Sequence, residues 1–103
     1  MREVRIRPRA QLDLDSIYSY ITLVLGAPKA ASSLVEKLYA AIERAAQLPE
    51  SGTVFSAPEL SQTYRRILVK NYWVYYTHDE NTLTVWRIFH TSRDIEDSTF
   101  IEL

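Results

Sequence analysis

The chain has no cysteine, no long apolar run and almost no net charge. Without thiols it forms neither disulfides nor thiolate metal sites, which is compatible with a cytoplasmic protein. The apolar stretch over residues 23–27 is far too short to cross a bilayer, and residues 1–7 lack the apolar core of a signal peptide. We therefore expect a soluble, cytoplasmic protein with no membrane partner.

The charge balance also limits the choice of partners. The net charge is −1, whereas proteins that bind nucleic acid chiefly through phosphates usually carry a clear basic excess. We therefore expect no sequence-specific DNA binding by this chain alone. Two histidines, with no close cluster of histidine and carboxylate, also predict neither a metal site nor a cofactor.

The period of the apolar residues changes along the chain. Residues 2–7 alternate apolar and charged side chains, which predicts a half-buried strand that Pro8 ends. The spacing then becomes helical and is interrupted at Gly26, so we expect helices over about 9–25 and 28–48 in an antiparallel hairpin. The expected apolar stripes are Ala10, Leu14, Ile17, Ile21, Val24, Ala31, Leu34, Leu38, Ala41 or Ile42, Ala45 and Leu48.

The second half of the chain favours strands. Residues 49–63, rich in proline and hydroxyl side chains, predict a long loop. Three runs of β-branched and aromatic residues follow, at 64–69, 72–77 and 82–90. We therefore expect one α+β domain over residues 1–103, with a strand, a helical hairpin and then a three-strand antiparallel meander (βααβββ). Its acidic end, residues 94–103, is expected to be a short helix or a flexible tail.

These elements resemble the RelE/ParE family of bacterial toxins. The arginine-bearing run from Tyr64 and the tyrosine-rich run from Tyr72 resemble the family's central hairpin. The exit of the last run, residues 90–94 (His-Thr-Ser-Arg-Asp), resembles the end of its last strand, while residues 10–17 and 48–49 resemble the limits of its helices. The likeness implies the toxin of a type II toxin–antitoxin module, associated with plasmid stabilisation and neutralised by a cognate antitoxin.

The family contains two chemistries. RelE-like members cut messenger RNA on the ribosome, whereas ParE-like members inhibit DNA gyrase and are not known as nucleases. Nuclease members place a basic residue at the start of the second hairpin strand, where this chain has Tyr72. Together with the charge of −1, this favours a ParE-like gyrase inhibitor that is not an enzyme. The alternatives are a ribosome-dependent endoribonuclease of the RelE/YoeB type and a degenerate member that only binds antitoxin.

Four residues are the expected contacts with the target: Arg65, Arg66, Tyr72 and Arg93. RNA cleavage would instead need a charge stabiliser and an acid–base pair, for which the candidates are Arg66, His90 and Arg93. Strict alternation would put His90 on one strand face with Thr84, Trp86 and Ile88, and Arg87 on the other face with Leu83, Val85 and Phe89.

Structural roles compete with these functional ones. His90 could equally hydrogen-bond at the end of its strand, toward the turn at residues 93–94, and Arg87 is expected to be structural. The dense aromatic residues are expected to form mostly core, with Tyr72 and Tyr76 the more exposed. We expect the antitoxin to bind through apolar contacts.

Overall fold

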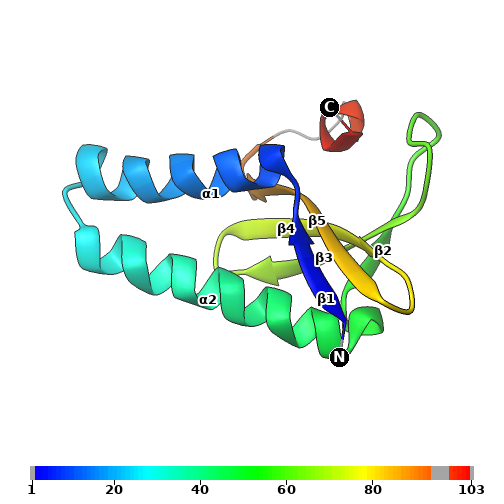
Figure 1. The fold of residues 1–103 in the computed structure, drawn as a ribbon. Helices are drawn as coiled ribbons and strands as arrows, with labels where there is room; N and C mark the ends of the chain where they lie inside the picture. Colours follow the sequence, from blue (N-terminus) through cyan, green and yellow to red (C-terminus); the bar gives the residue numbers. More distant parts are fainter. Residues whose placement is uncertain (1, 94–97, 103) are drawn as a thin grey trace.

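A helical hairpin covers one face of a mixed β-sheet (Figure 1). The computed structural model describes residues 2–93 and 98–102, without the side chains of residues 98 and 99. The elements in chain order are β1 (Glu3–Ile6), α1 (Pro8–Ser19), the π-helical turn η1 (Tyr20–Val24), α2 (Pro28–Gln47), the 3-10 helix η2 (Pro49–Ser51), β2 (Thr53–Phe55), β3 (Tyr64–Val69), β4 (Tyr72–His78), β5 (Thr82–His90) and the 3-10 helix η3 (Ser98–Glu102). The predicted α+β class and its βααβββ order are confirmed.

The strand order is β1-β5-β4-β3-β2, so the first strand lies beside the last. β1 runs parallel to β5, with Glu3 opposite Thr82 and Ile6 opposite Val85. The connection between these parallel strands is long, as a parallel pair requires: it begins with the helical hairpin and continues through β2, β3 and β4. β3, β4 and β5 form the predicted antiparallel meander.

One strand was not predicted. Within the expected loop over residues 49–63, β2 pairs antiparallel with the start of β3, placing Thr53 opposite Arg66. It is only three residues long and lies between proline- and serine-containing segments, so no alternating pattern marks it. Pairing with an existing sheet edge stabilises it, rather than its own propensity.

The first helix departs from its expected stripe at its C-terminal end. Ala10 and Leu14 are buried, but Val24 is 67% exposed. The helix widens to a π-turn, in which the Leu25 amide donates to the Tyr20 carbonyl at 3.2 Å. The extra residue rotates the following side chains, and Figure 1 shows the hairpin extending beyond the sheet, so Val24 has no layer to pack against.

The second helix packs on the sheet through small residues. Its buried side chains are Ala31, Leu38, Ala41, Ile42, Ala45 and Ala46. The expected stripe fails at Leu48, which is 69% exposed. The helix ends at Gln47, and the chain leaves helical geometry at Leu48 (φ −129°), so that Leu48 turns outward while Pro49 is buried.

Apolar clusters lie on both faces of the sheet. The larger one is formed with the helices, and a second, largely aromatic one lies on the opposite face, around Tyr64, Tyr75 and Phe89. Tyr76 was expected to be exposed but has 0% exposure. Its position on the helix side of β4 buries it, where its hydroxyl donates to the Pro49 carbonyl at 2.6 Å and accepts the Gly52 amide at 3.1 Å.

Candidate functional site

A hollow of about 340 Å³ opens between α1 and the ends of β4 and β5. It brings together three of the predicted site residues, Tyr72, His90 and Arg93. The other lining residues are Asp13, Ser16, Ile17, Tyr20, Ile88 and Phe89. The site therefore combines an apolar floor with polar and cationic groups at its rim.

A β-bulge decides which side chains of β5 reach this hollow. Tyr75 lies opposite Arg87 but Tyr76 lies opposite Val85, so Trp86 is an extra residue without a direct partner. The expectation of strict alternation was wrong here, because the bulge reverses the faces beyond it. His90 consequently shares the helix-side face with Val85 and Ile88, and not with Trp86.

Arg87 changes face for the same reason. It lies on the side of Trp86 and Phe89, with its guanidinium carbon 4.5 Å from the centre of the Phe89 ring. The expected grouping with Leu83 and Val85 was wrong, because those residues precede the bulge and pack against the helices. Its expected structural role agrees with its burial, since Arg87 is only 7% exposed.

Asp13 holds this part of β5 in place. β1 pairs only as far as Val85 because the chain turns at Pro8 into α1, which leaves the rest of the β5 edge without a strand partner among the described residues. Asp13 accepts the Ile88 amide at 2.9 Å, as a neighbouring strand would. It also accepts two hydrogen bonds from Arg87, at 2.8 and 3.0 Å. Such bidentate pairs fix geometry strongly.

His90 is engaged by the turn that follows it. The Ser92 amide donates to Nδ1 at 3.0 Å, and the Ser92 hydroxyl lies 2.7 Å from the same nitrogen. In the neutral ring the proton is therefore on Nε2, which offers a donor toward solvent. The ring also meets Tyr72 edge-on, with 5.1 Å between centroids.

The tyrosine in this pair keeps its proton. Burial raises the pKa of the Tyr72 hydroxyl, and the nearby Tyr20 raises it further. Tyr72 is thus a neutral hydroxyl over the whole physiological range, suited to hydrogen bonding with a partner. At this position the hollow offers no fixed positive charge.

Arg93 supplies the cation at the rim. Its guanidinium carbon lies 4.7 Å from the centre of the Phe89 ring and 4.9 Å from that of Phe100. Within the described part of the chain it forms no ion pair. Stacking holds the guanidinium plane, and no described residue accepts a hydrogen bond from it, so its donors are placed for an acidic or carbonyl partner.

The other two predicted contacts lie elsewhere. Arg65 donates to the carbonyls of Gly52 at 2.8 Å and Glu50 at 3.3 Å, which ties β3 to the segment before β2. Arg66 points to the sheet face away from the helices, where its guanidinium carbon lies 4.1 Å from the Trp73 ring centre. The structure therefore does not gather Arg65 and Arg66 with His90 and Arg93.

The sheet face away from the helices is covered by the chain itself. η3 packs there through Ile101, which is fully buried. The Glu102 carboxylate accepts hydrogen bonds from the Ser61 amide at 3.0 Å and from the Tyr64 hydroxyl at 2.7 Å. Hydrogen bonds from Ser61 and then Tyr64 lower the pKa of Glu102, while burial and the bond to Glu102 raise that of Tyr64.

Residues 4–95 match the family described as the ParE toxin of the type II toxin–antitoxin system parDE. The chain belongs to the ParE toxin family. No match was found among curated proteins. Among solved structures, one titled "Chromosomal ParDE TA system from P. aeruginosa" is similar in fold, with a TM-score of 0.68 at 19% identity over 87% of this chain and 96% of that one.

Family membership confirms the predicted resemblance and its ParE-like branch. The residue of this ParE-family toxin that sequence reasoning missed is Asp13, whose role depends on an edge created by the early end of β1. No motif marks it, since it is one acidic residue in an amphipathic helix. Ser16 and Tyr20, three and seven positions later, lie on the same helix face and could have been found from that spacing.

Two further findings concern the described residues alone. They contain no cluster of three or more histidine, cysteine, aspartate or glutamate side chains arranged to hold a metal ion. None of their helices combines the length and apolar character that a membrane crossing requires.

Proposed function

We propose that this ParE-family toxin inhibits growth by binding DNA gyrase in the cytoplasm, and that a cognate antitoxin neutralises it by occupying the hollow beside α1. The observation that carries the proposal is that Arg66, the charge stabiliser a nuclease would need, lies apart from His90 and Arg93, and that the other arginines of β3 and β5 are engaged elsewhere. Arg65 is bound to carbonyls at one sheet edge, Arg66 is stacked with Trp73 on the far face, and Arg87 is paired with Asp13.

The state of His90 supports the same proposal. A nuclease needs a base to activate the ribose 2′-hydroxyl. With Nδ1 accepting from Ser92, the neutral ring presents Nε2–H outward, which is a donor and not a base. Tyr72, with its raised pKa, is equally a poor base.

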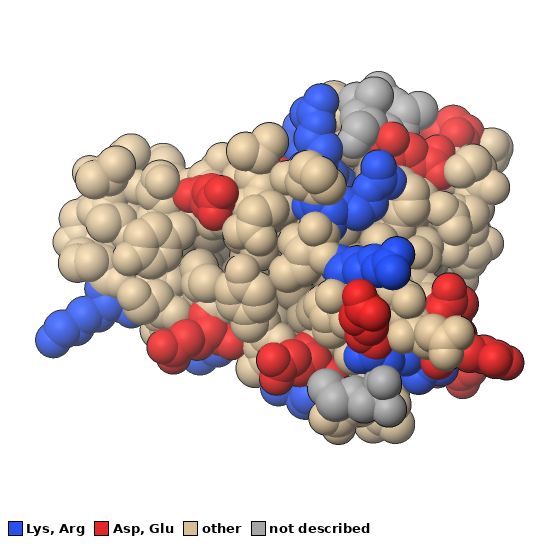
Figure 2. Space-filling model, in the orientation of Figure 1, with Lys and Arg blue, Asp and Glu red and all other residues tan. Residues whose placement is uncertain are grey.

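The antitoxin part of the proposal follows from the surface around the hollow. The hairpin next to it carries exposed apolar side chains, and Figure 2 shows its end with few charged residues. A disordered antitoxin segment that becomes helical could cover this surface with one apolar face. Arg93 at the rim would then meet an acidic residue or a helix C-terminus of the antitoxin.

Two assays on the purified toxin test the gyrase proposal. We expect inhibition of DNA supercoiling by gyrase, and intact messenger RNA on translating ribosomes. Arg93→Ala combined with Tyr72→Ala should weaken gyrase inhibition about tenfold or more, as the loss of central contacts does. Arg5→Ala, which removes an exposed charge on β1 away from the hollow, serves as the control. Codon-specific message cleavage that His90→Ala abolishes would overturn the proposal in favour of a ribosome-dependent endoribonuclease.

A further inference from the structure

The outer edge of β3 is only partly paired. β2 lies beside β3 from Phe55, opposite Tyr64, to Thr53, opposite Arg66. Beyond that point Ile67–Val69 pairs with β4 on its inner side, and no strand of the described residues lies along its outer side. Edges with unpaired main-chain donors and acceptors are places where a second chain can add a strand.

A hollow of about 360 Å³ opens at this edge, below α2. The helix contributes Ala41 and Arg44 to its lining, and the sheet contributes Arg66, Ile67 and Trp73. The small side chain of Ala41 leaves room between helix and strand. The unpaired stretch of β3 is therefore bordered by a space and by two guanidinium groups.

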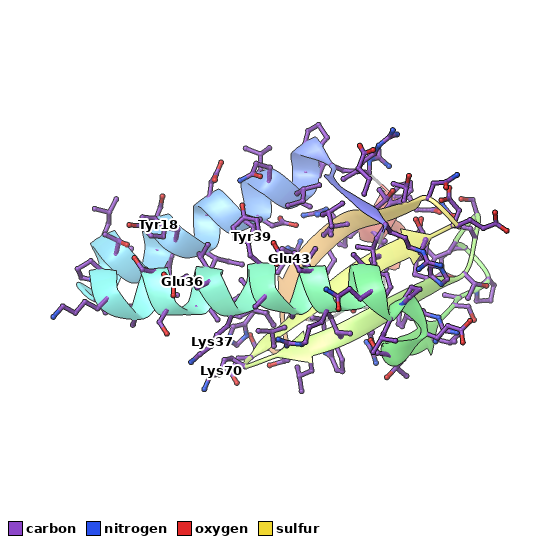
Figure 3. All side chains as sticks on the ribbon, turned by 60° about the horizontal axis from the view of Figure 1, so that its bottom comes forward. Tyr18, Glu36, Lys37, Tyr39, Glu43 and Lys70 are labelled. Atoms are coloured by element: carbon purple, nitrogen blue, oxygen red, sulfur yellow. The ribbon has the colours of Figure 1, made fainter. Side chains whose placement is uncertain are left out.

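Two lysines extend this positive border along the same edge. Lys37 is one turn before Ala41 and two turns before Arg44, which places it on the same face of α2. Lys70 follows directly after β3. In Figure 3 the side chains of Lys37 and Lys70 project on the same side of the molecule. We call this edge, with Lys37, Arg44, Arg66 and Lys70, the basic edge.

The basic edge is not neutralised within the described residues. The ion pairs that the described residues form lie away from this edge, within β1 and between α1 and β5. Glu36 and Glu43 each precede a cation of α2 by one position and so point about 100° away around the helix. Among the described residues no group accepts a hydrogen bond from the buried Nε–H of Arg66, while its guanidinium is held 4.1 Å from the ring centre of Trp73 and 4.8 Å from that of Phe55.

We propose that the basic edge binds an acidic, extended segment of the cognate antitoxin as an added strand along Ile67–Val69. Main-chain groups of that segment would satisfy the open edge, and its carboxylates would meet the four cations. A peptide fits these groups better than a nucleic acid, which offers no alternating donors and acceptors to a strand edge. The inference rests on neutralisation by an antitoxin and adds a second contact, at the β3 edge of the sheet and away from the hollow beside α1.

The test measures binding of the antitoxin encoded beside the toxin gene. Lys37→Glu with Arg44→Glu exchanges exposed helical residues for a good helix former, so the fold should persist. We expect the Kd to rise roughly tenfold or more at low salt, and the difference to shrink as salt increases. On binding, hydrogen exchange should slow for at least one amide within Ile67–Val69, a signature that charge attraction alone does not produce.

The control variant is Arg2→Glu with Arg5→Glu, which changes the net charge equally at positions on and beside β1, away from both proposed antitoxin contacts. Equal Kd values for the two variants, or unchanged exchange at Ile67–Val69, would overturn the inference while leaving neutralisation intact. Failure of the antitoxin to bind the wild-type toxin would overturn the proposed neutralisation itself. A synthetic peptide of alternating glutamate and valine should compete for the edge. A single-stranded RNA oligonucleotide that competes better would identify a nucleic-acid site instead.

Discussion

At the scale of single residues, Asp13 accepts a main-chain hydrogen bond from β5 where β1 has already ended. Its carboxylate accepts the Ile88 amide and two hydrogen bonds from Arg87, while Arg87 also donates to the Phe100 carbonyl at 2.8 Å. One buried ion pair thus joins α1, β5 and η3. Pairs of this kind fix an arrangement more than they stabilise it, because both charges have lost their water.

Replacing one charge of the Asp13–Arg87 pair should therefore lower the free energy of unfolding more than replacing both. We expect Asp13→Ala to lower the free energy of unfolding by about 3–5 kcal/mol, since Arg87 is left buried and unpaired. The double variant Asp13→Ala with Arg87→Met should lose less than Asp13→Ala alone. Urea denaturation of the wild type, Asp13→Ala, Arg87→Met and the double variant provides the comparison. A double variant that loses the sum of both single effects would show that burial of the unpaired charge is not the cause.

At the scale of elements, the long periodic segments could be predicted and the irregular ones could not. Both helices and four of the five strands follow from residue spacing and composition. The π-turn at Tyr20–Val24, the bulge at Trp86 and the short strand β2 all depend on packing partners far away in the sequence. Because the bulge reverses side-chain direction along β5, strict alternation predicted the wrong strand faces for Arg87 and His90. Of the predicted target contacts, Tyr72 and Arg93 line one hollow, because Tyr72 begins β4 and Arg93 follows the end of the neighbouring strand β5.

The π-turn leads to a prediction about the hairpin end. Leu23 is 78% exposed and Val24 67%, so replacing either with serine should change the free energy of unfolding by no more than about 0.5 kcal/mol. Leu38→Ala, in the buried stripe of α2, should cost about 2–5 kcal/mol. Chemical denaturation measures both. A loss at Val24 as large as that at Leu38 would mean that the hairpin end packs in solution.

The 3-10 helix η3 should respond to acid. Hydrogen bonds from Ser61 and Tyr64 lower the folded-state pKa of Glu102 below its usual 4.5. The stabilisation is therefore complete above about pH 4.5 and is lost as the pH falls through the lowered value. The Ile101 methyl resonances, followed by NMR during acid titration, should report release of η3. Glu102→Gln should abolish this transition, and the same transition in that variant would exclude Glu102 as its origin.

At the scale of the whole molecule, the described surface separates into regions of different chemistry. The hollow beside α1 is apolar with Arg93 at its rim, the basic edge lies beside β3, and the sheet face away from the helices is covered by η3. In this 103-residue chain the helical hairpin extends beyond the sheet, so apolar side chains at its end stay exposed and could still be buried by a partner. A partner that covers the hairpin would complete the core.

The toxin should consequently gain stability from its antitoxin. A ligand that binds only the folded state adds about 2.7 kcal/mol at a free concentration of 100 Kd. For a domain of this size that corresponds to a rise in Tm of roughly 10–20 °C. Thermal unfolding at increasing antitoxin concentration measures it. Tyr20→Ala with Arg93→Ala should need a higher antitoxin concentration for the same rise, whereas Arg5→Ala, on β1, should behave as wild type. Identical curves for all three proteins would place the antitoxin away from the hollow, and a constant Tm would argue against neutralisation by direct binding.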